Sequence, residues 1–311
     1  MQTYRSRFLV RGEVWYDHEP DLTPADCIFY RQRSHPVPGA KWRFFYTILL
    51  NLRQSPEVLR QQLSKSTAYK IRRAREKDGI LCEHLNPVSG EVLDAFEETY
   101  KRFAALKGLP PLDRARLDRL AAEGCLELTS AKDPDGKPLV QNAYYRDASR
   151  SCMLHTVSLY QMLSDSAARN AISRANRYLF WSDILRHQEQ GLILFDFGGW
   201  YPGSTDQELL DINRFKEGFG GRVVREYNCE QILILKGRVV LSAAAVLNSG
   251  RRVLAKLRAG PRPRKPDTSA TDGELRLANN SAATETPALH ESEAKAKVLL
   301  REEEKATPAL R

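Results

Sequence analysis

The sequence predicts an α/β or α+β fold, in which helices pack on the faces of a sheet. Short runs of aromatic and β-branched residues alternate with longer segments whose apolar residues recur at helical spacing. In addition, Asp135-Gly136 lies between two β-prone runs, which indicates an antiparallel hairpin. With 42% hydrophobic and 28% charged residues in 311 positions, the chain has enough apolar material for one large core or two small ones.

The N-terminal part is expected to form strands followed by one helix. Aromatic and β-branched runs between Pro- and Gly-containing breaks predict strands at 8–10, 27–30 and 42–50. Ser55-Pro56 then supplies an N-cap and a proline at the first helical position. A helix should run from there to about Lys77, where Asp78-Gly79 ends it.

The rest of the folded part alternates between helices and strands. Apolar spacing predicts helices at 90–107, 113–123 and 206–218, and a long helical region at 164–190 that is broken or bent near 173–176. Gly191 ends that region. Strands are expected where β-prone residues cluster, at 80–85, 126–129, 140–146, 152–158, 192–197 and 222–227.

Composition divides the chain into three parts. Residues 1–80 hold the first strands and a basic helix, and residues 81–260 hold the main α/β domain. From Pro261 onward the sequence has no aromatic residue and consists mainly of Ala, Glu, Thr, Pro, Lys and Arg. Because such a segment cannot bury enough apolar area to offset the entropy of ordering, 261–311 is predicted to be a disordered tail.

Charge and residue usage limit the class of protein. The formal net charge is +9, and the excess lies within residues 1–260, which favours an anionic partner such as RNA, a nucleotide-linked substrate, coenzyme A or a lipid phosphate. A soluble protein that is simply basic is the alternative. Five single cysteines and six scattered histidines suggest neither a metal site nor a redox pair.

The expected location is the cytoplasm. The N-terminus lacks the apolar core of a secretory signal, and no segment reaches the roughly 20 apolar residues that cross a bilayer. The apolar stretch from Val239 to Leu247 leaves peripheral membrane contact open as an alternative.

Two glycine-rich segments are candidates for the reactive site. Asp196 ends an apolar strand and is followed by Gly198 and Gly199, which allow close approach of a ligand or of another backbone. Further on, Phe215 should pack inward while Lys216 points elsewhere, where it could stabilise developing negative charge. Capping of a loop by Asp196 and of a helix C-terminus by Lys216 are the structural alternatives.

Two helical segments carry candidate binding residues. In the segment 173–181, polar groups able to bind an anion or a carbonyl precede an aromatic helix, and the candidates are Arg174, Asn176 and Trp181. The basic run 65–77 offers Lys70, Arg72 and Arg73 as anion- or donor-binding residues. For both segments, a solvated helix face is the alternative reading.

Four of these motifs in register resemble the Fem-type branch of the GNAT superfamily. They are the basic segment Ile71-Arg72-Arg73-Ala74, the helix Ala175-Asn176 to Trp181, the strand end Asp196-Phe197-Gly198-Gly199, and Phe215-Lys216 followed by Phe219-Gly220-Gly221. The resemblance covers about residues 52–228. It implies a GNAT-like mixed, largely antiparallel sheet with helices on both faces, a transferase domain at 81–260, and a reduced first half or extension at 1–80.

The resemblance also implies an activity: transfer of an acyl or aminoacyl group to an amine, as in cell-envelope or polysaccharide precursor metabolism. Phe215 and Lys216 match the pair that serves the donor and the transition state in Fem-type enzymes. The implied co-substrate is aminoacyl-tRNA or acyl-coenzyme A, with no bound cofactor and no metal. The sequence shows no Q/R-x-x-G-x-G/A pyrophosphate loop after 152–158, which favours aminoacyl-tRNA.

The hypothesis for the mechanism is that an acceptor amine attacks the donor carbonyl without a covalent enzyme intermediate. Lys216 stabilises the oxyanion, and Asp196 orients the amine or accepts its proton. Two other readings stay open: an acyl-coenzyme A dependent N-acetyltransferase of a small amine or sugar, and a non-catalytic module that binds RNA or another anion.

Overall fold

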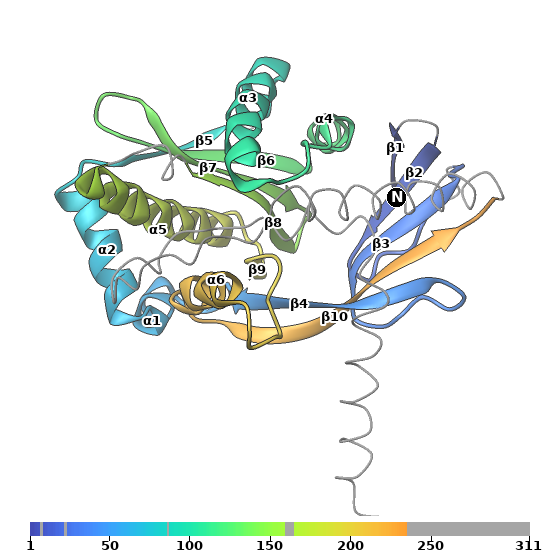
Figure 1. Ribbon diagram of the computed structural model, residues 1–311. Coiled ribbons are helices and arrows are strands. Elements are labelled where there is room, and N and C mark those ends of the chain that lie inside the picture. The colour runs from blue at the N-terminus through green and yellow to red at the C-terminus, as the bar shows by residue number, and fades with distance from the viewer. Residues whose placement is uncertain (7–8, 22–23, 86, 159–164, 235–311) are drawn as a thin grey trace, which may run out of the picture.

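The structure is a computed structural model that describes residues 1–6, 9–21, 24–85, 87–158 and 165–234 (Figure 1). The predicted tail at 261–311 and the apolar stretch at 239–247 lie outside these residues. Within them, ten strands form one sheet. Their order across the sheet is β1-β2-β3-β10-β4-β9-β8-β7-β6-β5.

The strands are spread along the whole described chain. They are β1 (Gln2–Ser6), β2 (Leu9–Trp15), β3 (Cys27–Arg33), β4 (Lys41–Asn51), β5 (Leu81–Leu85), β6 (Leu126–Lys132), β7 (Pro138–Arg146), β8 (Arg150–Ser158), β9 (Leu194–Asp196) and β10 (Arg222–Ile232). The pairs β2–β3 and β8–β9 are parallel, and the other neighbouring pairs are antiparallel. The expectation of a mixed, largely antiparallel sheet is therefore confirmed.

Six helices accompany this sheet in the described part of the chain. They are α1 (Pro56–Gln62), α2 (Lys65–Glu76), α3 (Gly90–Lys107), α4 (Arg114–Ala122), α5 (Ser166–Glu189) and α6 (Gln207–Glu217). In Figure 1, α3 and α4 lie on one side of β5–β8 and α5 lies on the other, so the expectation of helices on both faces is confirmed. The α6 helix lies over part of β4 and β10 (Figure 1).

The two largest apolar cores lie in these two layers. On the α3 side, Phe96, Tyr100 and Leu117 pack with Leu128 and Leu154 of the sheet. On the α5 side, an aromatic core joins the strands to α5 and α6, and its members include Ile48, Leu50, Phe180, Phe195, Phe197, Phe215 and Phe219. Burial of aromatic side chains on this scale fixes where α6 sits on the sheet.

The structure corrects two helix predictions. The single helix expected from Ser55 to Lys77 is divided into α1 and α2, because Leu63 leaves the helical region and the Ser64 hydroxyl caps a new helix by accepting from the Thr67 amide. The break or bend expected near 173–176 is absent from α5, which is one helix from Ser166 to Glu189. There the polar residues Ser173 and Asn176 are buried without interrupting the helix.

The strand predictions need smaller corrections. The β1 strand was not expected, and β10 continues five residues beyond the predicted end at Tyr227. By contrast, β9 is shorter than the predicted strand at 192–197. All of the first four strands join the same sheet as β5–β10, while the division of the chain at residue 80 stays a prediction.

Candidate functional site

The carboxylate of Asp196 lies at the end of β9 and is completely buried. Its Oδ1 accepts hydrogen bonds from the Thr47 hydroxyl and from the Gly198 amide, the latter at 2.8 Å. Its Oδ2 accepts from Gln32 Nε2 at 2.6 Å and from Arg150 Nη2 at 2.5 Å. Because two carboxylate oxygens accept about four hydrogen bonds, these four donors occupy Asp196 fully.

Arg150 links Asp196 to a second, partly buried acid. Its Nη1 and Nη2 donate to the two carboxylate oxygens of Glu226 at 2.7 and 2.9 Å, and its guanidinium carbon lies 4.4 Å from the ring centroid of Tyr16. Although burial opposes its charge, Asp196 and Glu226 raise the pKa of Arg150. Burial raises the pKa of the Glu226 carboxyl, and Arg150 opposes that rise. The site is thus held by one cation between two acids.

The two glycines after β9 form a turn whose backbone conformation is unfavourable for other residues. Gly198 and Gly199 have φ angles of +60° and +36°. A Cβ atom on Gly198 would lie 2.5 Å from the backbone oxygen of Met153, closer than such atoms approach. Glycine therefore lets the turn press against β8 and presents the two carbonyl groups of Gly198 and Gly199 to α6.

Lys216 of α6 reaches this turn from the opposite side. Its side chain is buried, with 3% of the residue exposed, and its Nζ donates to the carbonyl oxygens of Gly198 and Gly199. Burial lowers the pKa of Lys216 to about 8, and Asp196 opposes this effect. An ammonium group has three N–H donors, so one remains for another acceptor. The structure therefore brings Lys216 together with Gly198 and Gly199, beside Asp196.

Phe215 and Trp181 belong to the aromatic core. The guanidinium carbon of Arg177 lies 4.8 Å from the centroid of the Phe215 ring, and Phe215 meets Phe180 edge to face. Phe215 thereby anchors α6 beside α5, which holds the neighbouring Lys216 in register. The predicted contact of Phe215 and Trp181 with a substrate stays a prediction.

The two other candidates on α5 have different surroundings. Arg174 makes a bidentate ion pair with Asp78, through Nε at 2.5 Å and Nη2 at 3.0 Å. Asn176 is completely buried, and within the described residues neither its amide nitrogen nor its amide oxygen has a hydrogen-bond partner. An unpaired buried carboxamide is costly, so Asn176 is the α5 candidate most in need of a polar ligand or a water molecule.

The basic candidates lie on α2, which packs against α5. Arg72 and Arg73 are exposed, and Lys70 is half-buried. Arg73 donates to the Tyr69 hydroxyl at 3.2 Å. An anion-binding role for this helix stays a prediction.

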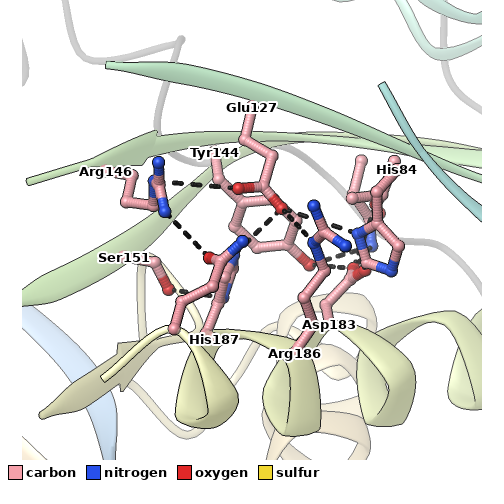
Figure 2. A network of polar contacts seen from close by, with 11 residues as sticks. His84, Glu127, Tyr144, Arg146, Ser151, Asp183, Arg186 and His187 are labelled. Carbon is pink, nitrogen blue, oxygen red and sulfur yellow. Dashed lines mark hydrogen bonds and ion pairs between the residues drawn. The ribbon is translucent and has the colours of Figure 1, made fainter. Parts of the chain in front are cut away.

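A second polar cluster, which the sequence did not indicate, lies between α5 and β5–β8. Figure 2 shows Asp183, Arg186 and His187 projecting from α5 toward the strands that carry Glu127 and Tyr144. His187 contacts the Ser151 hydroxyl at 2.9 Å through Nδ1 and Glu127 at 3.3 Å through Nε2.

The acids of this cluster are also held by several partners. Asp183 Oδ2 accepts from the hydroxyl of Tyr144 at 2.6 Å and from Thr129 and Asn142 at 3.0 and 3.1 Å. Ser151, His187 and Glu127 are all completely buried, and His187 bridges the other two. The cluster therefore joins α5 to the sheet.

Sequence reasoning missed Gln32, Thr47 and Arg150, which donate to Asp196, and Glu226, which holds Arg150. These four residues lie in four different strands, β3, β4, β8 and β10, and none of them belongs to a local sequence motif. A polar residue such as Thr47 inside the apolar run of β4 is the one available signal, since a buried hydroxyl needs a partner. In the described part of the chain, no group of three or more His, Cys, Asp or Glu residues is arranged to hold a metal ion. No helix of that part is long and apolar enough to cross a membrane.

Comparison with known proteins gives structural similarities only. No family model matches the chain, and no curated protein matches it. Among solved structures, FemX is similar, with 16% identity and a TM-score of 0.49, over 60% of this chain and 61% of the FemX chain. The chain thus spans about three fifths of FemX.

Two further similarities are weaker. The C-terminal domain (DUF2156) of a putative lysylphosphatidylglycerol synthetase from Agrobacterium fabrum has 17% identity and a TM-score of 0.43, over 71% of this chain and 72% of that one. The N-myristoyltransferase of Saccharomyces cerevisiae, solved with bound myristoyl-CoA, has 14% identity and a TM-score of 0.35, over 66% of this chain and 51% of that one. TM-scores below 0.5 do not establish a shared fold, so none of these similarities assigns an activity.

Proposed function

We propose that this chain transfers an acyl or aminoacyl group to an amine, with Lys216 as the group that stabilises the oxyanion. The observation that supports this is the buried ammonium of Lys216, fixed by two backbone carbonyls with one N–H left over. A donor fixed in advance and removed from water is the arrangement that stabilises a developing negative charge most strongly.

In the proposed reaction, the acceptor nitrogen forms a bond to the donor carbonyl carbon, and the carbonyl oxygen becomes the oxyanion that Lys216 stabilises. The bond from that carbon to the leaving oxygen of an ester, or sulfur of a thioester, then breaks. The amine proton passes to the leaving atom, so no covalent enzyme intermediate is needed.

In this scheme, Asp196 has a positioning role. Its oxygens are filled by four donors, one of them the Gly198 amide, so the carboxylate fixes the turn whose carbonyls hold Lys216. If Asp196 instead accepted the proton of the amine, one of these hydrogen bonds would first have to break.

The donor we favour is aminoacyl-tRNA, and the acceptor an amine of a cell-envelope or polysaccharide precursor in the cytoplasm. This choice rests on the sequence motifs, the basic α2 helix and the missing pyrophosphate-loop pattern. An acyl-coenzyme A donor is the second candidate, because a thioester presents the same carbonyl to the same lysine.

The test is mass-spectrometric detection of transfer, with charged tRNA and acetyl-coenzyme A offered separately together with a panel of amines. Loss of one oxyanion donor typically lowers kcat by roughly 100- to 1000-fold, which is the expected effect of Lys216→Met. Lys137→Met removes the same charge from an exposed turn and should leave transfer unchanged. Transfer that survives Lys216→Met at the wild-type rate would refute the assignment, and circular dichroism shows whether the variant is folded.

A further inference from the structure

Four aromatic rings lie together on one exposed face of the sheet, and we call them the aromatic patch: Trp42, Phe44 and Tyr46 of β4 and Tyr227 of β10. Trp42 and Phe44 are exposed over 48% and 41% of their surface, unusually high values for rings of this size. The centroid of Trp42 lies 5.3 Å from that of Phe44 and 5.4 Å from that of Tyr227. The rings therefore form one continuous surface.

A cation completes this surface. The guanidinium carbon of Arg225, an exposed residue of β10, lies 4.7 Å from the centroid of the Phe44 ring. Arg225 pairs with Tyr46 in the register of β4 and β10, so it belongs to the same face as the rings. Aromatic faces with an adjacent arginine bind the bases and the phosphates of single-stranded nucleic acid.

The aromatic patch shares a face of the sheet with the α6 side of the candidate site. Side chains alternate along a strand, so Trp42, Phe44 and Tyr46 share the face of Ile48, which packs in the core with Phe215. In Figure 1, β4 and β10 extend beyond the part that α6 covers.

The backbone gives a second link between the patch and the site. The chain that leaves the Gly198-Gly199 turn reaches the patch at Tyr46. There the backbone amide of Trp200 donates to the backbone carbonyl oxygen of Tyr46 at 2.6 Å. Leu49, seven residues beyond Trp42, is the partner of Asp196 in the sheet, and both of these side chains lie on the face opposite the patch. Seven residues of strand span roughly 23 Å, a length that a few nucleotides of extended strand cover.

The flanks of the patch favour a chain-like ligand over a lipid surface. At one end, the connection between β3 and β4 crosses β10, where the Val37 amide contacts Cys229, the residue paired with Trp42. At the other end, the Trp200 segment lies against Tyr46. Insertion into a bilayer requires side chains that stand out from the molecule, whereas a strand of RNA can lie between two such flanks.

We propose that the aromatic patch binds single-stranded RNA, stacking its bases on Trp42 and Phe44, with Arg225 beside a phosphate. This inference rests on the proposed function in one respect: the bound strand would present its acylated end to Lys216. It also adds a nucleic-acid contact on β4 and β10 to the anion-binding role that the sequence predicts for α2.

The experiment measures the binding of a fluorescein-labelled single-stranded RNA to the full chain by anisotropy, at several salt concentrations. Trp42→Ala and Phe44→Ala should each weaken binding roughly 5- to 150-fold, the range for loss of one stacked base. Leu81→Ala removes an equally exposed apolar side chain outside the patch and should bind as wild type does. Because both patch residues are exposed, thermal unfolding should show little change in either variant.

Several outcomes would overturn the proposal. Wild-type affinity in both patch variants, or the absence of RNA binding by wild type, would refute it. Binding to phosphatidylglycerol vesicles that is lost in the patch variants, while RNA binding is kept, would instead assign the patch to lipid.

Measuring RNA binding and transfer in the same variants distinguishes failure of this inference from failure of the proposed function. Lys216→Met should bind RNA normally even if it abolishes transfer. Transfer that depends on Lys216 in a chain without RNA binding would refute only the patch. Patch-dependent RNA binding in a chain without transfer would refute only the enzyme.

Discussion

Replacing Arg150 with methionine removes the cation that two acids share. Asp196 is completely buried and Glu226 is partly buried, and Arg150 donates to both within 2.5 to 2.9 Å. Methionine keeps much of the side-chain volume, so the change isolates the loss of charge and of hydrogen bonds. The expected result is a large fall in the free energy of unfolding.

The size of the effect follows from the burial of the partners. Removing one partner of a buried ion pair costs about 3 to 5 kcal/mol, because the remaining charge stays buried without compensation. Arg119→Met is the control, since Arg119 pairs with Glu123 one turn away on an exposed helix face, where such pairs contribute about 0.5 kcal/mol or less. Urea denaturation followed by circular dichroism measures both values.

The pH dependence gives a second check on Arg150→Met. Burial raises the pKa of Glu226, and without the guanidinium nothing opposes this rise. In wild type this pKa is about 7, and in the variant it should be higher. The deficit should therefore shrink as the pH falls toward 7, where only the folded variant has taken up the proton, and should change little below pH 7. A loss below about 1 kcal/mol, or a deficit that does not depend on pH, would show that Arg150 does not hold these acids.

Three further measurements test other parts of the structure. Burial lowers the pKa of His155 to about 3, so its neutral form is favoured in the folded state. Stability should therefore fall by about 2 kcal/mol from pH 7.5 to pH 5 relative to His155→Phe, and equal pH slopes would contradict this. Gly198→Ala should destabilise more than Gly136→Ala in thermal unfolding, because both have positive φ but only Gly198 faces the Met153 oxygen at 2.5 Å; equal losses would remove the steric argument. If the Lys216 ammonium stabilises the oxyanion, the rate of transfer by wild type should decline above pH 8, near the pKa of Lys216. The rate of Lys216→Arg should not decline over the same range. A flat wild-type profile from pH 7 to 9.5 would count against that role.

Most of the elements follow from local sequence, since periodicity and capping residues act over a few positions. The helices α3, α4 and α6 and the strands β6, β7 and β8 begin and end close to the predicted positions. The division between α1 and α2 depends on whether Ser64 acts as a cap or as a helical residue, and pattern alone does not decide this. The β1 strand is held by pairing with β2 and has no periodic signal of its own.

The candidate site was predictable only in part. Asp196, Gly198 and Lys216 stand in local motifs that suggest a strand end and a helix beside it. The residues that donate to Asp196 from other strands do not stand in such motifs. They lie between 46 and 164 positions from Asp196 in the sequence. Such pairings are set by the order of strands in the sheet, which hydrophobic spacing does not contain.

The position of β10 has a consequence for synthesis. This strand is inserted between β3 and β4. The backbone amide of Gln32 in β3 donates to the side-chain oxygen of Asn228 in β10 at 2.9 Å, although the two residues are 196 positions apart in the sequence. Until β10 has left the ribosome, β3 and β4 therefore have open edges, and so Gln32 of β3 cannot yet be held beside Asp196. A nascent chain stopped before residue 222 should remain dependent on chaperones, whereas one released after residue 232 can close the sheet and the candidate site in a single step.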